Sequence, residues 1–131
     1  MTDPLSITVG ILAILGACSA GVKTLRSAYV SSQEYTRLEM ELDHLHDVIK
    51  FVDGLVTEHQ LTGDALIKNL TLARSKLQEV HNFIHKSLRR SSPLPIKRRT
   101  LVRHKNRLVF FAKDIETTKA HIVDSILLSN L

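Results

Sequence analysis

Residues 35–56 have the sequence YTRLEMELDHLHDVIKFVDGLV, the clearest structural signal in the chain. Their apolar side chains recur at alternating intervals of three and four positions, which aligns them on one face of an α-helix. Gly54 weakens the pattern, since glycine inside a helix costs about 1 kcal/mol relative to alanine. The stretch predicts one amphipathic helix of about 28 residues. Its apolar seam consists of Tyr35, Leu38, Leu42, Leu45, Ile49, Val52 and Val56.

Signals on both sides of this stretch set its limits. Ser31, followed three residues later by Glu34, matches a capping box at the start of a helix. Gly63 predicts the end of that helix, and Asp64 is predicted to cap the next one. The second seam has the same spacing and consists of Leu66, Leu70, Ala73, Leu77, Val80 and Ile84.

The helix that carries the second seam should end near Arg90, because the sequence SSPLP at residues 91–95 cannot continue a helix. A last helix is predicted over residues 97–128, with Lys105 and Lys119 interrupting its apolar stripe. Four long helices with short connections predict an all-α fold, an up-down helical bundle, with a short fifth helix left open. An intermolecular coiled coil is the alternative. The last stripe consists of Leu101, Leu108, Phe111, Ile115, Ile122 and Ile126.

Composition agrees with one helical domain over residues 1–131 and excludes several classes of protein. Apolar residues make up 44% of the chain, which excludes general disorder, and only 5 glycines and 3 prolines argue against a β-sandwich. The single cysteine, Cys18, excludes a disulfide framework and a cysteine zinc cluster. With no tryptophan and 5% aromatic residues, the chain is poorly equipped to stack nucleic-acid bases.

Residues 4–22, PLSITVGILAILGACSAGV, are 19 consecutive uncharged residues, just enough for a helix to cross a bilayer. A secretory signal peptide needs a basic N-terminal region, whereas this chain opens with Met1-Thr2-Asp3. The same absence counts against the lipobox-like LGAC at residues 15–18. The glycine and hydroxyl residues of this segment lower its apolarity and argue against a permanent transmembrane helix. We therefore expect an apolar first helix that is buried in the resting protein.

This first helix has two predicted stripes. Bulky side chains from Ile7 to Leu25, including Cys18, form the stripe that should lie in the core. Small side chains beside it would let a neighbouring helix approach closely, either in a bundle or in lipid. The predicted membrane-insertion residues are Leu5, Ile7, Ile11, Leu12, Ile14, Leu15 and Val22, and the predicted close-packing small residues are Gly10, Ala13, Ala17 and Gly21.

The charge is distributed unevenly along the chain. The first 65 residues carry 4 basic and 9 acidic side chains, and the remaining residues carry 14 and 4. No acidic residue occurs between Val80 and Lys113. Such a field attracts phosphate on nucleic acid or on an anionic membrane, and it could also dock against the chain's own acidic segment, residues 34–64. The predicted basic surface consists of Lys86, Arg89, Arg90, Lys97, Arg98, Arg99, Arg103, Lys105 and Arg107.

Catalytic motifs are missing from the sequence: it contains no phosphate-binding loop, dinucleotide fingerprint, zinc-protease helix or nucleophile elbow. His81 and His85 have the spacing to hold one metal on a helix face, but no third ligand is evident. His44 and His46 point to different faces of their helix. Cys18 in an apolar helix should be inert. The sequence therefore predicts a non-enzymatic protein with no catalytic residue, metal or cofactor.

Two segments resemble a known family. The opening DPLSI at residues 3–7, followed by an uncharged helix with small residues, is similar to the start of the N-terminal domains of fungal STAND (NOD-like) receptors, called HeLo-like or SesA-like domains. The sequence LVRHKNRL at residues 101–108, after a proline-containing loop and a basic run, resembles their final helix. The likeness covers residues 3 to about 125 of the chain. It implies a helical signalling module of cell death, heterokaryon incompatibility or innate immunity, whose first helix reaches membranes on oligomerisation.

Together these observations predict a signalling bundle that self-associates and binds membranes through its apolar helix and basic surface. Polybasic charge and apolar insertion are the two signals that stable membrane attachment requires. The expected partners are further copies of the domain, anionic lipid, and a STAND receptor or another helical domain. The resemblance places the protein in the cytoplasm and, on activation, at a membrane. The alternatives are a protein-binding adaptor without membrane activity and a nucleic-acid-binding module, although no nucleic-acid-binding motif is present.

Overall fold

A computed structural model describes residues 4–28, 33–59, 63–89 and 98–129 of the chain. These residues form four α-helices and no strand: α1 (Pro4–Ala28), α2 (Gln33–His59), α3 (Asp64–Arg89) and α4 (Arg98–Ser129). The predicted all-α bundle of four long helices with an apolar first helix is confirmed. The predicted cap at Ser31 and the loop at residues 91–95 lie outside the described residues.

Local chemistry explains where two of the helices begin. Pro4 begins α1, at a position where a helix does not need the N–H that proline lacks. At the start of α3, the backbone N–H of Ile67 donates to the carbonyl oxygen of Gly63 at 3.1 Å. Gly63 is therefore the capping residue, and the prediction for Asp64 is wrong by one position. As the first residue of α3, Asp64 instead brings its negative charge to the positive end of the helix dipole.

The predicted seams form the core. Every seam residue of α2 and α3 is at most 8% exposed. Gly54 lies on the exposed side of α2, so the missing side chain leaves no gap in the core. Of the predicted stripe in α4, Leu101 lies outside the residues whose side chains are described. The remaining core residues of α4 are Leu108, Phe111, Ala112, Ile115, Ile122 and Ile126.

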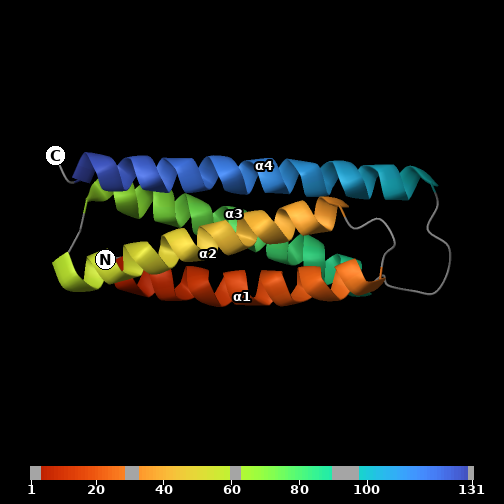
Figure 1. Cartoon of the computed structure of the whole chain (residues 1–131), viewed down its shortest axis with the longest axis horizontal. Coiled ribbons are helices and arrows are strands. Elements are labelled where there is room, and N and C mark those ends of the chain that lie inside the picture. The colour runs from red at the N-terminus through yellow and green to blue at the C-terminus, as the bar shows by residue number, and fades with distance from the viewer. Residues whose placement is uncertain (1–3, 29–32, 60–62, 90–97, 130–131) are drawn as a thin grey trace.

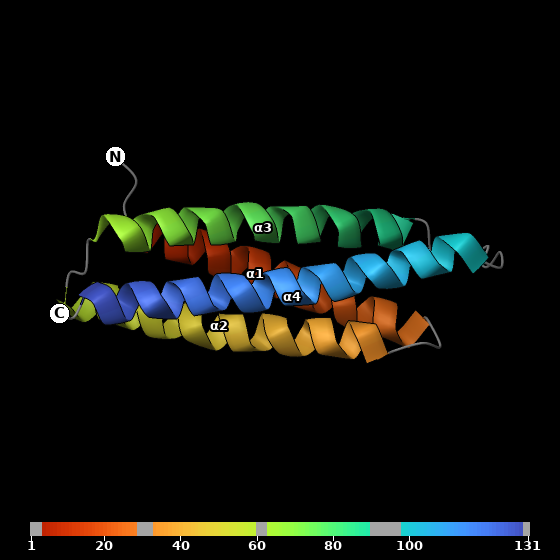
Figure 2. The ribbon, with the colours of Figure 1, turned by 90° about the horizontal axis from the view of Figure 1, so that it is seen from above.

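The helices alternate in direction, but consecutive helices are not always neighbours. α1 and α3 run one way and α2 and α4 run the other way (Figures 1 and 2). α1 packs against α2 and α3, and α4 packs against the same two helices. In the described part of the chain, α2 and α3 therefore occupy opposite corners of the bundle, as do α1 and α4. Because α1 is parallel to α3, the end of α1 lies near the end of α3 and the start of α4.

Candidate functional site

The inner face of α1 is a continuous part of the core. Ile7, Ile11, Cys18 and Val22 are buried as predicted, and so is Leu25. The predicted Ile14 is only half-buried. Leu15 is fully buried in its place, because the seam follows spacings of four, three and four from residue 11. Leu12 also packs at the edge of the core, whereas Leu5 is exposed.

The outer face of α1 carries no charge from Leu5 to Ala20. Leu5 and Val9 are 39% and 58% exposed, and the other exposed residues from Leu5 to Ala20 are small or hydroxyl-bearing. The span Leu5–Arg26 is long and apolar enough to cross a membrane, and 39% of its most apolar 18-residue window is buried in the bundle. Core helices of soluble proteins pass the same test of length and composition. The distinguishing feature here is the uncharged solvent-facing side, because a surface helix ordinarily exposes a charged or polar face.

The prediction of close helix contacts at the small residues is wrong for Gly10, Ala13 and Ala17. Ala13 and Ala17 are exposed, and a Cβ added to Gly10 would meet no atom within 4 Å. Gly21 is the member of the set that is buried. The physical reason is the area available for burial: the bulky stripe of α1 removes far more apolar surface from water, so it sets which side faces the core.

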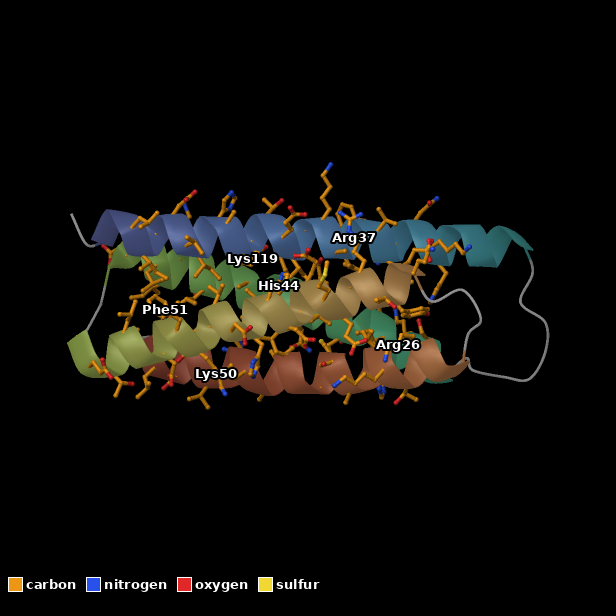
Figure 3. The ribbon with its side chains drawn as sticks, viewed as in Figure 1. Arg26, Arg37, His44, Lys50, Phe51 and Lys119 are labelled. Carbon is orange, nitrogen blue, oxygen red and sulfur yellow. The ribbon has the colours of Figure 1, made fainter. Side chains whose placement is uncertain are left out.

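Polar contacts join α1 to α2 at both ends of their seam. At one end, the hydroxyl of the buried Thr8 lies 2.9 Å from Asp53 Oδ1 and 2.8 Å from the Leu5 carbonyl oxygen. At the other end, Arg26 Nη1 donates to Glu39 Oε2 at 2.6 Å. Figure 3 shows Arg26 between the two helices. These contacts were not predicted from the sequence, although Glu39, an acid next to the seam residue Leu38, indicated a partly buried charge.

Between these contacts the edge of the α1–α2 seam is open toward solvent. A hollow of about 330 Å³ lies there, and small side chains of α1 form one of its walls. Leu15 and Leu42, which line it, are at most 1% exposed, so the hollow does not interrupt the core. The residues around the hollow are Leu15, Gly16, Ser19, Ala20, Lys23, Leu42, Asp43 and His46.

The described part of the predicted basic surface lies at the end of the bundle where α1 and α3 end and α4 begins (Figure 1). Lys86 and Arg107 are exposed and Lys105 is half-buried. Within the described residues, none of these three forms an ion pair with the acidic segment 34–64, so nothing observed favours internal docking. For the other six residues of the predicted surface, side-chain positions lie outside the described set. They are Arg89, Arg90, Lys97, Arg98, Arg99 and Arg103.

An aromatic cluster supports this basic end and was not predicted as a site. The hydroxyl of Tyr35 hydrogen-bonds to His104 Nε2, and the His104 ring lies 4.9 Å from that of Phe83. The guanidinium of Arg107 lies over the rings of Phe83 and Phe111, at 5.7 and 5.0 Å. Burial lowers the pKa of His104 below its ordinary value. The cluster fixes Arg107 at the surface by cation–π contact instead of by an acid.

Two buried carboxylates on α2 face different neighbours. Glu39 pairs with α1, whereas Glu41 Oε2 lies 3.7 Å from Lys119 Nζ on α4 and has no hydrogen-bond partner. Lys119 interrupts the apolar stripe of α4 because its ammonium group is the countercharge of Glu41. Lys76 and Asp114 join α3 to α4 in the same way, at 3.4 Å.

Cys18 lies in the core of the bundle, and His81 and His85 lie one turn apart on α3. Cys18 is fully buried, its Sγ lies 3.8 Å from the Leu77 carbonyl oxygen, and burial raises its pKa to about 12. The rings of His81 and His85 stack with centroids 6.2 Å apart. No group of three or more metal-ligating side chains occurs in the described part of the chain.

No protein-family model, no curated protein and no solved structure matches this sequence.

Proposed function

We propose that the protein is a non-enzymatic signalling bundle whose α1 transfers from the bundle to an anionic membrane. The observation that carries the proposal is the uncharged outer face of α1, from Leu5 to Ala20. A helix with an apolar inner face and an uncharged outer face can exchange a protein core for lipid without desolvating a charge. The resemblance to HeLo-like domains implies the same type of action, with homotypic assembly as its consequence.

The position of the basic end supports the proposal. Lys23 and Arg26 follow the apolar span of α1, and they lie at the same end of the bundle as Lys86, Lys105 and Arg107. Each basic side chain near an anionic leaflet contributes about 1 kcal/mol of attraction, which salt weakens. The basic residues would therefore hold the bundle at the surface beside the end of α1.

Release of α1 into water would be strongly unfavourable. Burying one large apolar side chain contributes about 1.5–3 kcal/mol. α1 buries five aliphatic side chains and one thiol: Ile7, Ile11, Leu15, Val22, Leu25 and Cys18. In a bilayer the same side chains are buried again, in lipid. The proposal therefore requires a membrane as the acceptor of α1, and the resting protein keeps α1 in the bundle.

The experiment compares two lysine substitutions in a vesicle co-sedimentation assay. The parent should bind phosphatidylglycerol vesicles in a salt-sensitive manner and should not bind phosphatidylcholine vesicles. Ala13→Lys introduces a charge at the middle of the span, at an exposed position of the bundle. Salt should weaken the electrostatic part of vesicle binding and leave the part that depends on insertion of α1. We expect Ala13→Lys to weaken this remaining binding about 100-fold, since a lysine at a bilayer centre costs about 2.5–3.5 kcal/mol.

The matched control is Ala120→Lys, the same substitution at an exposed alanine of α4. Both variants should unfold within about 0.5 kcal/mol of the parent, because both sites are on the surface. Equal vesicle binding by the two variants would refute insertion of α1. Stronger retention on duplex DNA than on vesicles would favour the nucleic-acid-binding alternative.

The adaptor alternative has one supporting observation, an apolar hollow of about 310 Å³ between α2 and α4. Phe51, 62% exposed, lies there between the two helices (Figure 3), beside Val48, Val123 and Leu127. Exposed apolar groups of this kind are found at protein interfaces. If Phe51→Ser abolished self-association while vesicle binding was absent in the parent, the adaptor function would replace the membrane function.

A further inference from the structure

Arg26 is placed where two different anions can reach it. It ends the apolar span of α1, and its guanidinium contacts Glu39 on α2 at 2.6 Å. The Glu39 side chain is 11% exposed and the Arg26 side chain is 40% exposed. The carboxylate is thus mostly buried, while the Arg26 side chain that binds it remains partly exposed to solvent.

This pair lies at one end of the seam between α1 and α2. The hollow between α1 and α2 lies between the Arg26–Glu39 pair and the Thr8–Asp53 hydrogen bond. α1 meets both α2 and α3 through core side chains, and its Cys18 lies against Leu77 of α3. The Arg26–Glu39 pair adds a charged contact to the apolar seam between α1 and α2, and a competing anion can displace this contact.

We propose that Arg26 is a switch residue: Glu39 binds its guanidinium in the resting bundle, and the phosphate of an anionic lipid takes the place of Glu39 when α1 enters a bilayer. This inference rests on the proposed membrane function. A guanidinium presents the same fork of donors to carboxylate and to phosphate. A cation that follows a span of about 20 residues lies at the level of the lipid headgroups. The ion pair that breaks on release is therefore replaced.

Cys18 is the reporter for the first half of the test. It is the only cysteine of the chain and is fully buried against α3, so its labelling by a soluble thiol reagent in buffer measures departure of α1. Glu39→Gln and Arg26→Gln break the same pair. Each should raise the labelling rate about tenfold beyond any change in its unfolding constant, measured in urea.

The matched control is the exposed pair Arg37–Glu116, which joins α2 to α4 at 4.0 Å. Arg37→Gln and Glu116→Gln make the same changes in net charge as the two test variants. Their Cys18 labelling should change only as their unfolding constants do. If labelling of the Glu39→Gln and Arg26→Gln proteins followed unfolding in the same way, the pair would not hold α1 and the inference would be overturned.

The second half of the test separates the two members of the pair on phosphatidylglycerol vesicles. Glu39→Gln frees Arg26 and should bind more tightly than the parent. Arg26→Gln lacks the cation and should bind about fivefold more weakly than Glu39→Gln, beyond the ratio of the control variants Glu116→Gln and Arg37→Gln. Equal ratios for the test and control pairs would overturn the role of Arg26.

Two further results identify the source of the phosphate and separate the two proposals. Inorganic phosphate, at the concentration of lipid phosphate, should not raise Cys18 labelling; an increase would assign the competing anion to free phosphate and overturn the lipid assignment. If no protein binds anionic vesicles, the proposed membrane function itself fails. If the parent binds and the ratios for the two pairs are equal, only the switch at Arg26 fails.

Discussion

At the scale of single residues, His104 links the protonation state of the protein to its packing. Its ring contacts Tyr35 and Phe83, and burial lowers its pKa below the ordinary value of 6.5. The unfolded chain therefore binds a proton near pH 6.5, whereas the folded protein binds it only at lower pH. The stabilisation from His104 is complete above pH 6.5 and is lost as the pH falls below that value.

We predict that His104→Gln reduces the loss of unfolding free energy between pH 7.5 and pH 5.5, because glutamine does not titrate. Urea unfolding at the two pH values measures the effect. His44→Gln, at an exposed position of α2, is the control and should retain the pH dependence of the parent. A His104→Gln protein with the full pH dependence of the parent would show that other groups cause it.

At the scale of the element, α1 shows how the phase of a helix is chosen. Its bulky and small stripes both had the periodicity of a helix face, and only one could face the core. The bulky stripe prevails because the free energy of burial grows with the apolar area removed from water. Gly10 and Ala13 consequently lie away from close helix contacts.

This phase has a measurable consequence at Gly10. A Cβ there would meet no atom within 4 Å, so Gly10→Ala should stabilise the protein by about 0.5–1 kcal/mol through the higher helix propensity of alanine. Gly54→Ala in α2, also in open space, is the matched comparison and should have a similar effect. Urea or thermal unfolding measures both. Destabilisation by Gly10→Ala alone would restore the close-packing interpretation.

At the scale of the whole molecule, the parallel arrangement of α1 and α3 brings the end of the apolar span to the basic end of the bundle (Figure 1). An anionic surface that attracts residues 86–107 is then also close to Arg26. The opposite end carries several acids, including Asp53, Asp64 and Asp124, and would be repelled. The charge distribution thus favours one orientation of the bundle on a membrane.

We expect the triple substitution Lys97→Glu, Arg98→Glu, Arg99→Glu to weaken binding to phosphatidylglycerol vesicles by at least 100-fold, at about 1 kcal/mol for each lost cation. The control replaces Lys50, Lys68 and Arg74 by Glu. These residues are exposed and lie in the second half of α2 and the first half of α3. The net charge is the same in both proteins, so equal binding would show that total charge, and not the basic end, governs attraction.

Much of the fold followed from the sequence. The seam residues of α2 and α3 are buried as predicted, because a regular three-four spacing has only one helix face to bury. The predicted limits near Arg90 and at residue 97 agree with the end of α3 and the start of α4 to within one residue, whereas α2 ends at His59, before the predicted stop at Gly63. The exception at Gly63 shows that a capping position depends on which backbone carbonyl accepts the first hydrogen bond.

The candidate site could be predicted only in part. The uncharged span and the basic run are properties of consecutive residues, and the sequence alone determined both. The pairing of Arg26 with Glu39, of Glu41 with Lys119 and of Tyr35 with His104 was decided by the tertiary structure. The same is true of the choice of α3 as the parallel neighbour of α1. Periodicity specifies which face of a helix is apolar. The free energy of packing the four helices together selects the neighbours of each helix and the partner of each charge.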